Sequence, residues 1–448
     1  MARIDALHSW AGRLSAPLLC LAVFCRCAVR GDAAGLNLPL AALMAGCLAL
    51  ATVSGRGVAR RDGAAAESGA MGVALAILAG VEVVSHLRSP YQPNSFFALR
   101  EAASLLLLFC FARSLLGDAA ARRRLYLWMT GFGAVWAGAD ALRCLRSLAE
   151  LRALGVGDLT AFKQYFSYGS WTTQALLLLP YPLGLLAGEA GSASPPPRDV
   201  GARRRIAPEV VAMAPPALVA VALMVGTVYS FSRGAYAALA FFLLLAGAGH
   251  AACRRAPARG PALACAAACL LALAATPVMR SVLGTASLLS TASQVRSFTA
   301  RQRLLAGALQ TAARVPAFGV GGGNYPLVAM AGEGVAGAGG DYVPTPLNRF
   351  AATAVEKGVA GLAAHVGALA LFFSVSLRKL ARGRGGCGGA PCGAAALIPL
   401  VAAVAAAVVH QMSYYPAHGD EGAAALEWVA YAVAASLPVG DGGDGGRR

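Results

Sequence analysis

The sequence predicts an all-α integral membrane protein with about twelve transmembrane helices and one large extracytoplasmic loop. Of its 448 residues, 58% are hydrophobic and only 13% are charged, which is far more apolar than an ordinary soluble protein. The apolar residues gather in segments of about 17 to 25 residues, the length that crosses the hydrocarbon core of a bilayer as a helix. This pattern is typical of a multi-pass membrane protein.

The expected spans divide the chain into three parts. They cover residues 14–30, 35–54, 69–86, 96–116, 124–141, 171–188, 208–230, 235–252, 260–279, 349–377, 393–412 and 421–438. We expect an N-terminal bundle over residues 1–280, an extracytoplasmic loop over 281–346, and C-terminal helices with a short tail over 347–448.

Basic residues cluster after every second span. The clusters lie at residues 56–61, 122–124, 203–205, 254–255 and 378–384. Because cytoplasmic loops carry an excess of lysine and arginine, these loops and both termini are predicted to be cytoplasmic. This asymmetry explains much of the formal net charge of +17, so we expect membrane lipids and no nucleic acid as partners.

An amphipathic helix with a cationic face is predicted within the long outer loop. Its apolar residues are Phe298, Leu305, Leu309 and Ala312, and its opposite face carries Arg296, Arg303, Gln310 and Arg314. The spacing of both sets follows about 100° per residue. Pro316 ends the helix. The following glycines, Gly319, Gly321, Gly322 and Gly323, allow a tight turn that another group can approach closely.

Arginines on the predicted outer face favour an anionic ligand. Between residues 280 and 346 five arginines face only two acidic residues, on the side where positive charge is disfavoured. Arg233 is the single charged residue between 209 and 254, and a guanidinium there fits a phosphate, which it can hold with two hydrogen bonds. Two simpler alternatives stay open: an arginine that reaches to lipid headgroups and a solvated basic face.

Two carboxylates are predicted at the outer mouths of spans, where they are candidates for a functional site. Glu356 shares a stripe with Arg349 and Thr353, at steps of four and three, and Glu101 begins the fourth span. Ionisable residues within membrane segments are functional candidates. Alternatively, Glu356 neutralises Arg349, and Glu101 pairs with its neighbour Arg100. His86 and His418 are further outer-loop candidates.

Three stretches carry a family resemblance. They are the turn Ser232, Arg233 and Gly234; residues 303–325, with Arg303, a helix, Pro316, Gly319, Gly321 and Tyr325; and Asn348, nine residues, Gly358, two residues and Gly361. In this order and spacing they resemble the O-antigen ligase and polymerase family of bacterial membrane glycosyltransferases. The similarity covers roughly residues 160–440. Leu347 stands where the ligases carry a histidine, which favours the polymerase side of the family or a divergent relative.

The resemblance implies a fold of the lipid-carrier glycosyltransferase kind in the bacterial inner membrane. It also implies an inverting, metal-independent transfer of a glycan from an undecaprenyl-diphosphate carrier to a glycan or lipid acceptor at the outer face. No metal site or cofactor is expected. Arg233 and Arg303, with Arg301 and Arg296 as further candidates, would bind the diphosphate, whose negative charge develops as the glycosidic bond breaks. Glu356 and Glu101 would be the catalytic carboxylates.

Two alternatives remain. A secondary transporter or channel for small anions would also use many spans and buried arginines, but transporters commonly show inverted repeats and helices broken near the bilayer midplane, and neither is clear in the sequence. A non-catalytic relative that only binds lipid-linked glycans is the second, because Leu347 cannot accept a proton.

The loop charges generate a topology prediction. With the native cysteines removed, a cysteine at Ser293 should react with a membrane-impermeant thiol reagent in intact spheroplasts, because the loop over 281–346 faces outward. Labelling only after lysis would contradict this orientation.

Overall fold

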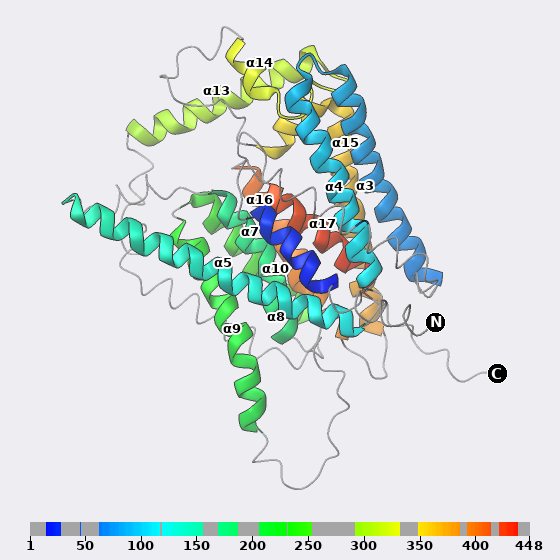
Figure 1. Ribbon diagram of the computed structural model, residues 1–448, viewed down its shortest axis with the longest axis vertical. Coiled ribbons are helices and arrows are strands. Elements are labelled where there is room, and N and C mark those ends of the chain that lie inside the picture. Colours follow the sequence, from blue (N-terminus) through cyan, green and yellow to red (C-terminus); the bar gives the residue numbers. More distant parts are fainter. Residues whose placement is uncertain are drawn as a thin grey trace.

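The chain folds into helices throughout the part that the structure describes (Figure 1). The computed structural model describes residues 15–27, 45, 62–116, 119–155, 169–186, 206–230, 232–252, 292–331, 348–385, 392–413 and 421–437. These residues contain helices and turns and no strand, which confirms the all-α fold class.

The helices have the following bounds. They are α3 Asp62–Arg88, α4 Gln92–Leu115, α5 Ala119–Ala153, α7 Gly169–Leu178, α8 Pro180–Leu186, α9 Ile206–Tyr229, α10 Arg233–Ala252, α13 Ala292–Arg314, α14 Tyr325–Ala331, α15 Arg349–Gly385, α16 Cys392–Gln411 and α17 Glu421–Ser436. A further apolar helix covers Ser15–Cys27.

Most of the predicted spans coincide with these helices. The spans 35–54 and 260–279 lie outside the described residues, and span 171–188 corresponds to α7 and α8 in succession. Four described helices are long and apolar enough to cross a membrane: Gly69–Arg88, Gln92–Leu115, Gly234–Ala251 and Arg349–Arg382. The protein is therefore a multi-pass helical membrane protein, while the number twelve and the direction of the loops stay predictions.

The described helices pack in two groups that meet at α16 and α17. On one side α15 packs against α3, α3 against α4, and α4 against α17. On the other side α5 packs against α8 and α9, and both α7 and α10 pack against α16. Helix α16 contacts α15 of the first group as well as α7 and α10 of the second, so it lies between the two groups. Figure 1 shows α13 and α14 gathered at one end of α3 and α15, away from both marked termini.

The long helix α15 is broken at Gly358. This residue has φ 66° and ψ −167°, a left-handed backbone that glycine adopts without steric cost. The break removes the two helical hydrogen bonds that would join Val359 to Val355 and Ala360 to Glu356. An unpaired backbone group in a membrane costs roughly several kcal/mol. The two carbonyls and two amides released by the break therefore need other hydrogen-bond partners.

The turn that follows α13 supplies those partners. Val320 donates to the Val355 carbonyl at 3.0 Å, Gly321 to Glu356 at 2.9 Å, Val359 to Pro316 at 2.7 Å and Ala360 to Ala317 at 3.2 Å. Gly319 has φ 70°, and a side chain there would collide with the Val355 and Glu356 backbone. Two helical bonds are thus exchanged for four bonds between α15 and the turn, which we call the glycine junction, residues 316–324 and 355–360.

Polar residues of α3 and the turn lock this junction in place. Ser85 Oγ donates to the Glu356 carbonyl at 2.9 Å. The Asn324 amide donates to Ser89 Oγ at 2.7 Å and to the Tyr91 and Val320 carbonyls, each at 3.0 Å. The junction therefore joins α3, the loop turn and α15 through named hydrogen bonds.

Helix α13 has the expected cationic face, with one correction to its apolar face. Arg303, Gln310 and Arg314 are exposed, and Leu305 and Ala312 pack around buried Ala308 against Val355 of α15. Leu309, however, is 54% exposed. It lies one residue beyond Ala308, and the contact with α15 is too narrow to cover both.

The glycine junction predicts a strong effect of small substitutions. Gly358→Ala and Gly319→Ala should each destabilise the purified protein by about 1–3 kcal/mol or more, because a left-handed backbone is strained for alanine and the new methyl group meets backbone atoms. Thermal unfolding in detergent measures the effect.

Gly307→Ala in α13 is the matched control. No atom lies within 4 Å of its added carbon, and alanine favours a helix by up to about 1 kcal/mol over glycine. Equal melting temperatures for all three variants would contradict the role assigned to the junction.

Candidate functional site

A polar recess lies between α3, α4 and α15 and the ends of α16 and α17. It encloses about 770 Å³ of empty space, part of it open to the exterior. Its walls are Leu78, Ala79, Glu82, Ala98, Glu101, Ala102, Leu105, Arg349, Thr353, Lys357, His365, Gln411, Ala424 and Trp428. Charged and polar groups from α3, α4, α15 and α16 therefore meet in one place inside an apolar bundle.

The two cations of this recess are each matched by a buried carboxylate. Arg349 donates to Glu427 of α17 at 2.5 Å and to the Gln411 side chain at 2.6 Å. Lys357 forms an ion pair with Glu82 of α3. Glu427 and Glu82 are only 2% and 1% exposed, so both carboxylates are shielded from water, and the two ion pairs hold α15 against its neighbours.

Two further groups, Glu101 and His365, bring proton chemistry to the recess. Glu101, one of the two carboxylates predicted as catalytic, lies in its wall together with His365. His365 is 5% exposed, and its ring packs edge-on against Phe350 with centroids 5.8 Å apart. Among the described residues its Nε2 has no hydrogen-bond partner. A buried imidazole nitrogen without a partner is costly unless a ligand pairs with it.

Glu356, the other predicted carboxylate, lies in the glycine junction. Its carboxylate accepts backbone hydrogen bonds from Gly323 and Tyr325, and it is not part of the recess lining. The stripe that faces the recess is Arg349, Thr353 and Lys357, at steps of four. Arg349 forms its ion pair with Glu427 of α17. The charge of Arg349 is therefore balanced by Glu427, and not by Glu356 as the sequence alternative had it.

The first and third motif stretches converge on the end of α16. Asn348 caps α15, because its Oδ1 accepts from Ala351 at 3.1 Å, and its amide donates to the Met412 carbonyl at 3.1 Å. Ser232 Oγ accepts from Ala235 at 3.4 Å at the start of α10. A side chain at Gly234 would collide with Ser413. The starts of α10 and α15 are thus both fixed against residues 412–413.

The second motif stretch forms the glycine junction itself. Gly321 packs so tightly against Ser89 that a side chain would collide with it, and one at Gly361 would meet Lys357. Tyr325 is buried and donates to the Leu304 carbonyl at 3.4 Å, and burial raises its pKa. The motif residues therefore build the backbone around the recess.

The predicted diphosphate ligands lie on different elements. Arg301 and Arg303 are exposed on α13, and Arg233 begins α10. The side chains of Arg233 and Arg296, like His418, lie outside the described part. The structure thus brings Glu101 into the recess and gives the arginines of α13 an open face, and their joint role stays a prediction.

Four site residues were missed in the sequence: Lys357, His365, Gln411 and Glu427. A signal for three of them was present. His365 and Gln411 lie within apolar segments, and Glu427 is a carboxylate within the last one; polar and ionisable residues within such segments mark functional sites. The pairing of Lys357 with Glu82, 275 positions away in sequence, required the structure, as did the pairing of Arg349 with Glu427.

The buried ion pair of Arg349 predicts a specific pattern of stability. Glu427→Gln and Arg349→Met should each lower the free energy of unfolding by about 3–5 kcal/mol, because each leaves its partner buried without its counter-charge, whereas the double variant Arg349→Met/Glu427→Met should recover much of the loss. Thermal unfolding of the detergent-solubilised protein measures this.

The matched control is the exposed pair of Arg146 and Glu150, whose side chains are 80% and 45% exposed. Arg146→Met should change stability by about 1 kcal/mol or less. Additive losses in the double variant would contradict the assignment of Arg349 and Glu427 as one buried unit.

Comparison with known families agrees with the motif reading. Residues 218–366, about a third of the chain, match the family model described as O-antigen ligase. The match includes all three motif stretches and ends just past His365, and it is shorter than the range of 160–440 expected from the motifs. No curated protein matches the chain. Residues 218–366 of the chain are therefore similar to the O-antigen ligase family.

Proposed function

We propose that the protein transfers a glycan from an undecaprenyl-diphosphate carrier to a hydroxyl group of a second glycan or of a lipid, at the outer face of the bacterial inner membrane. The reaction would invert the anomeric configuration and need no metal. The family match over residues 218–366 supports the reaction class. The observation that carries the proposal is the polar recess, where the Glu101 carboxylate and the buried His365 lie together among charged groups of the bundle.

The charges of the recess favour a hydroxyl acceptor over an anion. Its two cations are balanced by Glu82 and Glu427, and Glu101 adds a further carboxylate. A diphosphate entering here would have to displace a buried counter-charge, which is costly. A sugar hydroxyl, in contrast, can donate to a carboxylate and to the open Nε2 of His365.

Glu101 is therefore assigned as the general base that accepts the proton of the acceptor hydroxyl. His365 would bind and orient the same hydroxyl or its neighbour. Glu356 is assigned a positioning role, since its carboxylate holds the backbone of Gly323 and Tyr325. The ligases carry a histidine at the position where this chain has Leu347, which cannot accept a proton. Glu101 in the recess would supply the missing proton acceptor.

Arg233 and Arg303 are assigned to the diphosphate of the donor, with Arg301 and Arg296 beside them. Arg303 is exposed on the face of α13 that turns away from α15, where it meets no competing carboxylate of the recess. A planar guanidinium holds two phosphate oxygens at once, and fixed cations there stabilise the charge that develops on the leaving group.

A small-anion transporter is the second candidate, and one observation favours it. The break of α15 at Gly358 is a feature of many transporters that the sequence did not reveal. In this chain, however, the four released backbone groups bond to the glycine turn, so none is left to bind an ion. The break therefore provides no free backbone groups for the ion site that a transporter would need.

The decisive experiment is a transfer assay with the purified protein in liposomes and a lipid-diphosphate-linked glycan as donor. Glu101→Gln should slow transfer by about 10²–10⁴-fold, the usual contribution of a general base, without loss of donor binding. Arg233→Lys and Arg303→Lys should each cost about 10²-fold or more, because lysine keeps the charge but loses the planar fork.

The control is Arg378→Lys, an exposed arginine towards the other end of α15, which should leave the rate unchanged. Normal transfer by both Arg233→Lys and Arg303→Lys would show that the diphosphate binds elsewhere. Anion flux through the liposomes without any glycan transfer would favour the transporter.

A further inference from the structure

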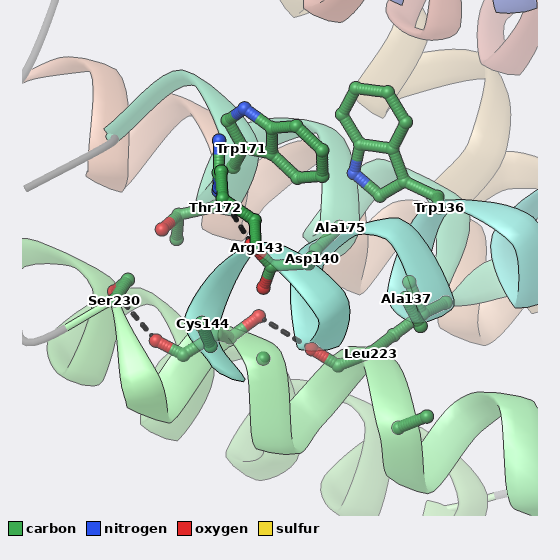
Figure 2. Close-up of a pocket in the computed structure, with 13 residues that line it drawn as sticks. Trp136, Ala137, Asp140, Arg143, Cys144, Trp171, Thr172, Ala175, Leu223 and Ser230 are labelled. Atoms are coloured by element: carbon green, nitrogen blue, oxygen red, sulfur yellow. Dashed lines mark hydrogen bonds and ion pairs between the residues drawn. The ribbon is translucent and has the colours of Figure 1, made fainter. Parts of the chain in front are cut away.

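A second polar pocket lies between α5, α7 and α9 (Figure 2). It encloses about 420 Å³ of empty space, partly open to the exterior. Its walls are Trp136, Ala137, Asp140, Arg143, Cys144, Trp171, Thr172, Ala175, Ala222, Leu223, Gly226, Thr227 and Ser230. We call it the tryptophan pocket.

A fixed stack of three planar groups forms one wall. The rings of Trp136 and Trp171 stack with centroids 3.9 Å apart and an interplanar angle of 18°, and the Arg143 guanidinium carbon lies 3.9 Å from the Trp171 centroid. Two groups so close must lie on opposite faces of the Trp171 ring, as Figure 2 shows. Asp140 accepts from Arg143 at 2.5 Å, which fixes a carboxylate beside the stack.

Two hydrogen-bonding groups of this wall lack partners. Trp136 and Thr172 are 4% and 1% exposed, and within the described part of the chain neither the Trp136 Nε1 nor the Thr172 Oγ1 has a hydrogen-bond partner. An unsatisfied buried polar group costs about 1–3 kcal/mol. Two of them lining one pocket, next to a carboxylate, indicate a ligand with several hydrogen-bonding groups.

The walls of the tryptophan pocket and of the recess are linked by a hydrogen bond between neighbouring residues of α7 and α16. Thr172 lines the pocket and Gln411 lines the recess. Their neighbours Thr173 and His410 hydrogen-bond to each other at 2.9 Å. Ser230, in the pocket wall, lies three residues before Arg233, the proposed diphosphate ligand. Neighbouring residues thus connect the pocket wall with the recess wall and with the proposed diphosphate ligand.

We propose that the tryptophan pocket binds a sugar ring of the donor glycan; this inference rests on the proposed function. A sugar carries a hydroxyl or ring oxygen on nearly every carbon, so it can pair with the indole N–H, the threonine hydroxyl and the Asp140 carboxylate together. Its C–H groups can pack against the apolar wall residues Ala137, Ala175 and Leu223. An acyl chain would leave the same groups unpaired in an apolar environment.

Calorimetric titration tests this site without relying on transfer. The protein is held in nanodiscs free of sugar-based detergent, and the probe is the oligosaccharide released from the lipid-linked donor by mild acid. Thr172→Val and Trp136→Phe should each raise the Kd about three- to tenfold, as expected for one lost hydrogen bond. Both remove a buried group without a partner, so folding should survive.

Two control variants match these changes. Thr130→Val also removes a buried hydroxyl that lacks a partner among the described residues, and Trp128→Phe changes a half-exposed tryptophan of the same helix; neither residue lines the pocket. Both should leave the Kd unchanged. An equal effect of all four variants, or an oligosaccharide that does not bind, would overturn the proposal.

Two further outcomes separate the sugar site from its alternatives. If glycerol 3-phosphate binds instead of the oligosaccharide, and Thr172→Val and Trp136→Phe weaken its binding, the pocket is a lipid headgroup site. That result would overturn the proposal. Oligosaccharide binding that depends on the pocket, in a protein that transfers no glycan, would support the sugar site and refute the transfer reaction. If the protein transfers glycan but the pocket variants bind the oligosaccharide with an unchanged Kd, the sugar site is refuted and the transfer reaction is not.

Discussion

The exchange of backbone hydrogen bonds at Gly358 is the interaction on which the rest of the site depends. A straight helix would satisfy Val355, Glu356, Val359 and Ala360 internally and would leave the loop turn without an attachment. The break instead presents two carbonyls and two amides to the turn after α13, and the turn forms a hydrogen bond with each of the four. Since irregular backbone at membrane depth is tolerated only where protein covers it, the loop and the helix must form together.

Several features of the site follow from this exchange. The break redirects α15, so that Arg349, Thr353 and Lys357 before and at the junction share the recess with His365 beyond it. Lys357 then reaches Glu82 of α3, and Arg349 reaches Glu427 of α17. The apolar side of α13 packs on the first part of α15, which leaves its arginines facing outward. A backbone constraint thereby sets the positions of charges that come from four elements: α3, α13, α15 and α17.

Fold class, span positions and motif order were predictable from the sequence because each rests on local periodicity or spacing. The cationic face of α13 is one example, since Arg303 and Arg314 follow from helical repetition alone. The recess was only partly predictable. Glu101 was identified, but the break at Gly358 was not, because Gly358 and Gly361 are equally compatible with a continuous helix. The partners of Arg349 and Lys357 depend on tertiary contacts across 78 and 275 residues, which no local pattern encodes.

The central claim is a division of labour: arginines of α10 and α13 bind the diphosphate, and the recess binds the acceptor hydroxyl. A structure of the protein with a non-hydrolysable lipid-diphosphate glycan bound measures this directly. The account predicts diphosphate density beside Arg233 and Arg303, with the ion pairs of Arg349 with Glu427 and of Lys357 with Glu82 intact. Diphosphate density between Arg349 and Lys357, with either pair broken, would contradict it.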